Sequence, residues 1–214
     1  MRVGILGSGD VGQALGTAFA TLEHDVKMGS RDPKSEKVRG WVSKNGPRAS
    51  GGTFAETAVF ADVAVLATLG SGTESAIKLA EPKSLAGKIV IDATNPLVLK
   101  PGEPPALALG HNDSGGEQVQ RWLPQSMVVK AFNMIGHAYM FRPQFPGGPP
   151  DMFYCGNDAG AKNRVGDILT SFGFEALDIG GIEGARLLEP LCILWVLYGL
   201  KTNGWNHAFK FLKR

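Results

Sequence analysis

Cysteine is scarce in this sequence, and its scarcity excludes two kinds of stabilising site. The 214 residues include two cysteines, Cys155 and Cys192, which lie far apart and form no Cys-x-x-Cys pair or Cys/His cluster. A disulfide framework or a zinc site would need more such residues at closer spacing. We therefore expect two buried thiols, a reducing cytoplasmic environment and no bound metal.

The sequence also has neither a large excess of charge nor a long hydrophobic run. Its 22 Lys and Arg against 20 Asp and Glu leave a formal charge of +2, which argues against nucleic acid or an anionic membrane as the main partner. The longest apolar run, Leu191 to Leu200, is too short to span a bilayer, and the first residues lack a signal-peptide pattern. We expect a cytoplasmic protein whose partners are small molecules.

Short apolar runs alternate with segments of helical periodicity along most of the chain. Branched residues dominate the expected strands, and two expected helices carry apolar residues at a 3.6-residue period, Val11 to Leu22 and Ala161 to Phe172. Such alternation predicts an α/β fold with a doubly wound parallel sheet, in which strands are apolar throughout. The expected strands are Val3–Leu6, Val26–Met28, Val63–Ala67, Ile89–Ile91, Val128–Ala131 and Phe153–Cys155.

Three segments depart from this alternation. Residues 95–116 and 143–150 are crowded with Pro and Gly and follow expected strands, so we interpret them as loops on the substrate side, with plain surface excursions as the alternative. Residues 183–214 are predicted to be helical. Because residues 187–200 are apolar on all sides, that helix is expected to be buried under its own sheet or against a second subunit.

A glycine-rich turn follows the first expected strand. Gly7-Ser8-Gly9-Asp10-Val11-Gly12 has the spacing Gly-x-Gly-x-x-Gly and opens an amphipathic helix. In this context Gly7 allows a tight turn, Gly9 lets a pyrophosphate approach the backbone, and Gly12 lets the helix pack on the strand. Free N–H groups at the helix start would hold the phosphates. The pattern predicts dinucleotide binding, the alternative being a glycine turn with no ligand.

The end of the second expected strand indicates which dinucleotide binds. Enzymes that use NAD usually carry an acidic residue there, whereas this chain has Ser30 and Arg31, followed by Lys34 and Lys37. The guanidinium of Arg31 suits a phosphate, and Asp32 is interpreted as a cap of the next helix. We therefore predict NADP(H) rather than NAD(H), the alternative being an exposed surface charge.

Several segments together resemble a known family. VGILGSGDVGQALG and GSRDPK, followed by VKAFN from Val128 onward, CGND from Cys155, LDIG from Leu177 and ARLLE from Ala185, resemble the NADPH:coenzyme F420 oxidoreductases. The cytosolic reductase domain of the STEAP metalloreductases is similar too. The resemblance covers essentially the whole chain and implies a Rossmann-like domain, residues 1–180, with a small helical C-terminal extension, residues 181–214, in a homodimer.

The same resemblance implies an activity and a set of binding residues. It implies hydride transfer between NADP(H) and a flavin-like ring, with coenzyme F420, FMN or FAD as co-substrate. Carried over by position, Ser8, Gly9, Asp10 and Val11 would bind the pyrophosphate. Ser30 and Arg31 would bind the 2′-phosphate, with Lys34 or Lys37 replacing a family lysine that is absent at Ser35. The nicotinamide pocket would be lined from the strand ends by Ala67, Thr68, Leu69, Asn95, Pro96, Ala131 and residues 133–136, Asn133 to Gly136.

No side chain can be named as a catalytic acid or base. Hydride transfer between two rings depends mainly on positioning, whereas reduction of a carbonyl or imine also needs a proton donor. His137 and Asn133 are the candidates, although a structural role for His137 is equally expected. Alternatives are an imine or carbonyl reductase, which would need a larger helical domain than the 36 residues after Asp178 provide (214 − 178), and a non-enzymatic NADP sensor.

Overall fold

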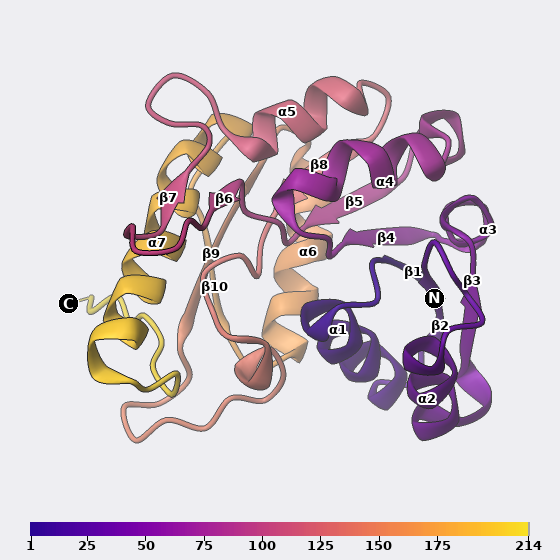
Figure 1. Cartoon of the computed structure of the whole chain (residues 1–214), viewed down its shortest axis with the longest axis horizontal. Helices are drawn as coiled ribbons and strands as arrows, with labels where there is room; N and C mark the ends of the chain where they lie inside the picture. Colours follow the sequence, from indigo (N-terminus) through magenta and orange to yellow (C-terminus); the bar gives the residue numbers. More distant parts are fainter. Residues whose placement is uncertain (214) are drawn as a thin grey trace.

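The computed structural model describes residues 1–213 and centres on one eight-stranded sheet (Figure 1). The strand order is β10-β9-β8-β5-β4-β1-β2-β3. All neighbours pair in parallel except β8 and β9, so the last two strands run against the rest. The strands are β1 (Arg2–Leu6), β2 (Asp25–Gly29), β3 (Ala49–Gly52), β4 (Val63–Leu66), β5 (Ile89–Asp92), β8 (Met127–Lys130), β9 (Asp151–Gly156) and β10 (Glu175–Asp178).

Helices cover both faces of this sheet, as the alternating sequence predicts. They are α1 (Asp10–Thr21), α2 (Glu36–Asn45), α3 (Phe54–Phe60), α4 (Thr73–Leu79), α5 (Gly115–Trp122), α6 (Ala159–Ser171) and α7 (Ala185–Thr202). One core cluster joins the sheet to α1, α2 and α6 through residues such as Leu15, Trp41 and Leu169. A second cluster joins it to α3, α4 and α5 through Ala58, Ile77 and Val119. Two separate cores are what a doubly wound sheet requires.

Local signals explain where several helices begin. Thr53 and Glu56 form a reciprocal capping box at the start of α3. Ser114 caps α5 by accepting from the backbone of Glu117, and Asp158 caps α6 in the same way. The start of α1 is different, because its N-cap residue is Gly9, which has no side chain to accept from the free N–H groups.

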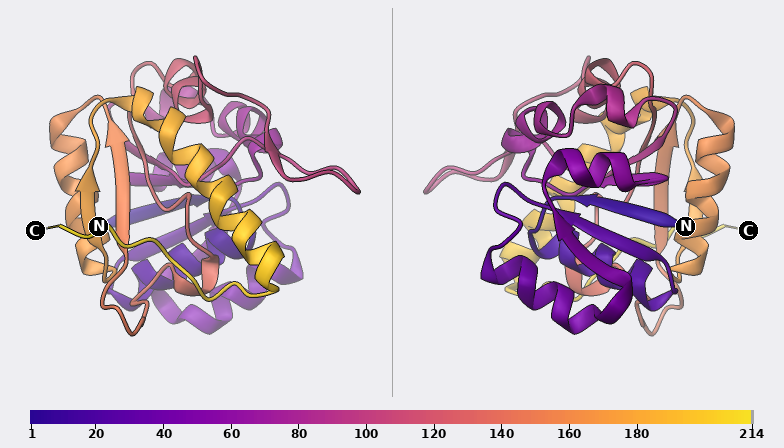
Figure 2. Two further views of the ribbon diagram at one scale, coloured as in Figure 1. Left: turned by 90° about the vertical axis from the view of Figure 1, so that its left-hand side faces the viewer. Right: turned by 90° about the vertical axis from the view of Figure 1, so that its right-hand side faces the viewer.

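All six expected strands are present, and the structure adds others that the sequence did not predict. β3 reads Ala-Ser-Gly-Gly and β10 reads Glu-Ala-Leu-Asp, so neither has the apolar character expected of a strand in such a sheet. The loop of residues 95–116 contains a small antiparallel hairpin, β6 (Leu97–Val98) with β7 (Ala106–Leu107), which projects from the body of the molecule (Figure 2). The predicted doubly wound parallel sheet is confirmed as a mostly parallel one, with a single antiparallel pairing between β8 and β9.

The prediction of a helix over residues 183–214 is wrong at its far end. α7 stops at Asn203, which adopts a left-handed conformation with φ of 49°, and the following residues run as an extended tail. Trp195 Nε1 donates to the carbonyl of His207 at 2.8 Å, and Lys210 pairs with the buried carboxylate of Asp151 at 3.2 Å. His207, expected in a final helix, therefore lies in a tail that packs back onto α7.

α7 buries only one face within the single chain. Ala185, Leu188 and Cys192 are buried, whereas Leu187 is 68% exposed and Leu194 is 55% exposed. Figure 2 shows this helix lying across the outside of the molecule. Burial of its outer face against a second subunit stays a prediction. No helix in residues 1–213 has the length and apolar character needed to cross a membrane.

Candidate functional site

The glycine turn between β1 and α1 is shaped by contacts that only glycine allows. Gly7 has φ of 132°, and a Cβ there would lie 2.4 Å from the carbonyl oxygen of Ala67. A Cβ at Gly12 would lie 2.1 Å from the carbonyl oxygen of Gly7, whereas one at Gly9 would meet nothing within 4 Å. The turn is therefore closely packed at Gly7 and Gly12, where it meets neighbouring backbone, and open at Gly9. With no side chain capping α1, its first N–H groups point at this open space and favour an anion.

Ser30 and Arg31 follow β2 at the same edge of the sheet. Pairing of Leu6 with Gly29 sets the end of β2 level with the end of β1. Arg31 and Lys34 are exposed, and neither forms an ion pair with any residue in 1–213. Lys37 instead reaches Asp10 of the glycine turn at 3.5 Å. Of the two candidate lysines, Lys34 is thus the one with a free ammonium.

Asp32 does not cap α2, contrary to the prediction. Its carboxylate accepts from the backbone N–H of Lys34 at 3.0 Å, and its own N–H donates to Ser30 Oγ at 3.2 Å. The residue that precedes α2 is Ser35. Asp32 therefore orders the turn that carries Arg31, and one of its oxygens is already used there.

The ends of β4 and β5 approach each other closely beside the glycine turn. Ala67 is buried, Thr68 shares a hydrogen bond of 3.0 Å with Thr73, and Leu69 is 83% exposed although apolar. A Cβ at Gly70 would lie 2.1 Å from the carbonyl oxygen of Asn95, so the two loops touch through backbone. An exposed leucine beside this contact provides an apolar surface at the carboxyl edge of the sheet.

Asn95 and Asn133 form a reciprocal amide pair between the ends of β5 and β8. Asn95 Nδ2 donates to the carbonyl of Asn133 at 2.8 Å, and Asn133 Nδ2 donates to Asn95 Oδ1 at 2.9 Å. Asn133 Nδ2 also donates to the carbonyl of Leu188 on α7 at 2.9 Å. Two acceptors fix this amide group, and its Oδ1 has no hydrogen-bond partner within residues 1–213 although Asn133 is only 4% exposed.

The backbone before Asn133 is strained. Phe132 is buried with φ of 63°, a left-handed conformation that is uncommon outside glycine. Its ring packs against Phe172 and Phe174, so tertiary contacts hold the conformation. Two other predicted residues of this loop do not join the amide pair. Ala131 is buried in the core, and Gly136 packs under the indole of Trp195.

His137 does not join the amide pair. It is exposed and lines a hollow of about 510 Å³ along the outer face of α1, together with Asp10, Gln13 and Trp41. No hydrogen bond links it to Asn133 within the described chain. Its role as a proton donor stays a prediction without a contact to support it.

Beneath the amide pair lies a buried charge cluster that the sequence did not predict. Lys130 Nζ lies 2.9 Å from Asp92 Oδ2 and 2.8 Å from Glu189 Oε1, and all three side chains are at most 1% exposed. The signal that could have found it is a charged residue ending each of two apolar strands, Asp92 after Ile-Val-Ile and Lys130 after Met-Val-Val.

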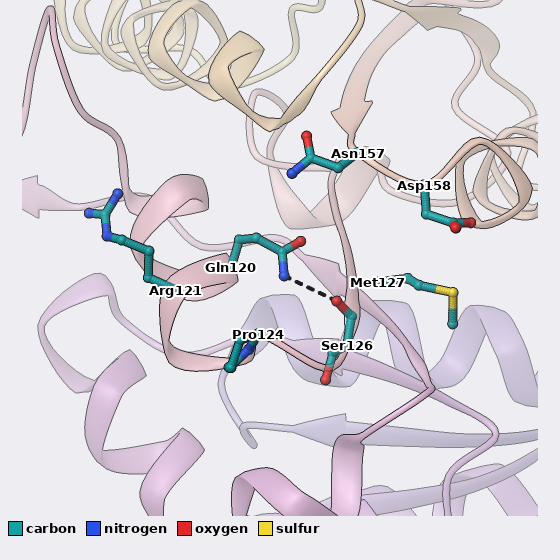
Figure 3. A pocket seen from close by; sticks show the side chains of 7 residues that line it. All are labelled: Gln120, Arg121, Pro124, Ser126, Met127, Asn157 and Asp158. Carbon is teal, nitrogen blue, oxygen red and sulfur yellow. Dashed lines mark hydrogen bonds between the residues drawn. The ribbon is translucent and has the colours of Figure 1, made fainter.

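A second hollow, of about 530 Å³, lies at the opposite edge of the sheet (Figure 3). Its polar groups are already engaged: Gln120 donates to the carbonyl of Ser126, Asp158 caps α6, and Arg121 pairs with Asp113. Because it opens at the start of β8 and the end of the antiparallel β9, it lies away from the glycine turn.

Both cysteines are buried and unpaired, as predicted. Burial raises the pKa of Cys155 to about 12 and that of Cys192 to about 11, so neither thiol ionises near neutral pH. Within residues 1–213, no group of His, Cys, Asp and Glu side chains is placed to hold a metal ion.

Comparison with known proteins bears on what this edge of the sheet does. Residues 2–96 match the family model described as NADP oxidoreductase, coenzyme F420-dependent. The F420-dependent NADP reductase of Methanocaldococcus jannaschii is 31% identical over 94% of this chain and 93% of its own. The chain belongs to the F420-dependent NADP reductase family. This membership confirms the prediction of an NADP-dependent oxidoreductase.

Two further relatives define how far the similarity extends. Rat metalloreductase STEAP3 is 33% identical over 99% of this chain, and the chain spans 42% of that protein's length. A provisionally assigned F420-dependent NADP reductase from Arthrobacter sp. FB24 is 35% identical, covers both chains fully and superposes with a TM-score of 0.93, which confirms the predicted Rossmann-like fold. Imine reductases share the fold alone, at 13% identity and a TM-score of 0.67 for the Streptomyces aurantiacus enzyme.

Proposed function

We propose that this protein binds NADPH along the carboxyl edge of its sheet and transfers a hydride to a deazaflavin or flavin ring. The observation that carries the proposal is that two anion-binding features lie at the ends of adjacent strands. One is the uncapped start of α1 at Gly9, and the other is the guanidinium of Arg31, which has no ion-pair partner within residues 1–213. Together they offer one anion site for the pyrophosphate and a second for the 2′-phosphate that distinguishes NADP from NAD.

The strand order supports the direction in which the dinucleotide lies. β1 separates β2 and β3 on one side from β4, β5 and β8 on the other. A dinucleotide crosses such a switch point, one nucleotide over each half of the sheet. With the 2′-phosphate at Arg31, the nicotinamide half lies over the ends of β4, β5 and β8.

The residues at that second half fit a nicotinamide ring. Ala67 and Leu69 supply apolar contact that excludes water from one side. Asn95 is partly exposed and supplies a side-chain amide there, and the buried Asn133 fixes that amide through two hydrogen bonds. NADPH supplies the hydride, and the reduced acceptor ring completes its reduction with one proton from water.

Within residues 1–213, no ionisable side chain is hydrogen-bonded to the amide pair, which favours a flavin-like acceptor over an imine or carbonyl. Asn95 and Asn133 neither gain nor lose protons near neutral pH, and Lys130 below them is fully buried. A carbonyl or imine would need a proton delivered in the transition state, whereas ring-to-ring hydride transfer needs close parallel positioning.

A stopped-flow assay tests this proposal. NADPH oxidation is followed by its nicotinamide absorbance with coenzyme F420, FMN and FAD offered separately, and each is repeated with NADH. We expect oxidation of NADPH in preference to NADH with one of the three rings. Tight NADPH binding without oxidation by any ring would contradict the proposed acceptor class and favour a small carbonyl or imine substrate or a sensor.

A further inference from the structure

The buried cluster of Lys130, Asp92 and Glu189 joins three separate elements at one ammonium group. Lys130 ends β8, Asp92 ends β5, and Glu189 lies in α7. Besides its two carboxylate partners, Lys130 Nζ donates to the carbonyl of Thr94 at 2.7 Å. All three hydrogens of the ammonium therefore have acceptors, which is the condition for burying a lysine at tolerable cost.

The charges in this cluster are compensated by backbone donors. Two carboxylates face one ammonium, leaving one formal negative charge, and the N–H groups of Gly115 and Gly116 at the start of α5 each donate to Glu189 at 3.0 Å. Burial alone would lower the pKa of Lys130, but Asp92 and Glu189 outweigh it and raise that pKa. The ammonium is thus charged throughout the physiological range.

Each carboxylate partner of Lys130 is linked to the amide pair through one neighbouring residue. Asp92 Oδ1 accepts from both the N–H and the hydroxyl of Thr94, at 2.9 and 2.7 Å, and Lys130 holds the carbonyl of Thr94, the residue before Asn95. On the other side, Glu189 follows Leu188, whose carbonyl accepts from Asn133 Nδ2. Both amides are therefore positioned by peptides that the cluster holds.

We propose that Lys130 is a positioning residue for the nicotinamide end of NADPH, acting through Asn95 and Asn133. This inference rests on the proposed function. A buried ion pair is weak evidence of stability in itself, because apolar side chains of similar volume often stabilise a core as well. What apolar residues cannot do is fix three peptide segments in one geometry by directed hydrogen bonds.

A purely structural cluster and a positioning cluster differ in what they do to binding. Loss of stability alone would weaken every ligand of the folded protein to a similar extent. Loss of positioning would affect the nicotinamide end and spare the phosphate end, because Gly9 and Arg31 lie on the other half of the sheet and have no contact with the cluster in the described chain.

The test compares two ligands by isothermal titration calorimetry. One is NADPH, and the other is 2′-phospho-ADP-ribose, which carries the phosphates and lacks the nicotinamide. The first variant is Lys130→Met, which removes the ammonium. The second is Glu189→Gln, which keeps the side-chain size but places an amide N–H group where Lys130, Gly115 and Gly116 donate to a carboxylate. Lys162→Met is the matched control, since Lys162 forms a half-exposed pair with Asp178 at 2.9 Å on α6 and β10.

In the wild type we expect NADPH to bind more tightly than the fragment. Each cluster variant should lose about tenfold in NADPH affinity, the value of one well-formed hydrogen bond, while the fragment's affinity and both affinities of the control are retained. The fluorescence of bound NADPH, which reports restriction of the nicotinamide ring, should fall in the same variants.

Other outcomes separate the two proposals. If a folded Glu189→Gln variant keeps the wild-type ratio of the two affinities, Lys130 does not position the nicotinamide. The positioning role is overturned in the same way if wild-type protein binds NADPH no better than the fragment. If the wild type binds neither ligand, the proposed function itself fails. Should Lys130→Met not fold, Glu189→Gln decides the question.

Discussion

Replacing Arg31 with alanine should weaken NADPH binding and leave NADH binding nearly unchanged. Arg31 is exposed and without an ion-pair partner in residues 1–213, so its removal breaks no ion pair in the free protein and should not alter folding. Any loss of affinity then reports on the ligand. NADH lacks the 2′-phosphate, which makes it an internal control for damage elsewhere in the site.

The magnitude follows from exposure and charge. A hydrogen bond between two charged groups contributes about 1.5–3 kcal/mol, and solvent screening of an exposed guanidinium favours the lower end of that range. A loss of about 1.5–2 kcal/mol corresponds to roughly 10- to 30-fold in the dissociation constant. Because the interaction is exposed, added salt should reduce the difference between NADPH and NADH.

The assay is a fluorescence titration of wild type, Arg31→Ala and a matched control, Arg48→Ala. Arg48 is also exposed but lies before β3, where it pairs with Asp25 at 3.2 Å, so this variant removes the same charge away from the site. Equal losses for NADPH and NADH in Arg31→Ala, or a loss as large in Arg48→Ala, would refute the assignment of Arg31 to the 2′-phosphate.

Three further outcomes can be measured. Gly12→Ala should lower the thermal unfolding temperature and abolish NADPH binding, since its Cβ would lie 2.1 Å from a carbonyl oxygen. Gly9→Ala should fold normally and only weaken binding, because its Cβ would meet no atom within 4 Å. Equal unfolding temperatures of the two variants would contradict this interpretation of the turn. Leu194→Glu should convert a dimer into a monomer in light scattering, and a wild-type monomer would refute a dimer through α7. The hydrogen bond from Arg186 lowers the pKa of Glu117 below its usual 4.5. Because the folded-state pKa of Glu117 is depressed, its hydrogen bond with Arg186 stabilises the folded protein above about pH 4.5. That stabilisation is lost as the pH falls through the folded-state pKa. Arg186→Ala should therefore lower the resistance of the protein to urea at neutral pH and not in strong acid.

What could be predicted from the sequence is what neighbouring residues determine. The glycine turn was predictable because its three glycines, the strand before it and the helix after it lie within about twenty residues, and the steric reasons are local. The Ser30–Arg31 tip followed from the same short-range pattern. Strands such as β4 were recognisable because burial on both faces makes every residue apolar.

What could not be predicted depends on contacts between distant segments. β3 forms from Ala-Ser-Gly-Gly because β2 pairs with it, and the closest packing there, Gly51 against Val38, requires a missing side chain rather than an apolar one. The tail after Asn203 belongs to a segment predicted to be helical, but Lys210 in it donates to Asp151 of β9, a contact that the sequence does not reveal. Asp92 and Lys130 are 38 residues apart in the chain, so their charged strand ends indicate an ion pair only once β5 is known to lie beside β8.

The carboxyl edge of the sheet has two halves that differ physically, and the difference separates binding affinity from ring placement. Over β1 and β2 the groups proposed to bind phosphate are exposed backbone N–H groups and free cations, which attract charge but tolerate small movements. Over β5 and β8 the amides of the buried Asn133 and the partly buried Asn95 are hydrogen-bonded to each other. Lys130 holds the neighbouring carbonyl of Thr94 beneath them, which leaves them little freedom. Hydride transfer is sensitive to ring placement, while phosphate binding is not. Substitutions in the first half should therefore change mainly how tightly the nucleotide binds, and substitutions in the second half mainly how productively it binds.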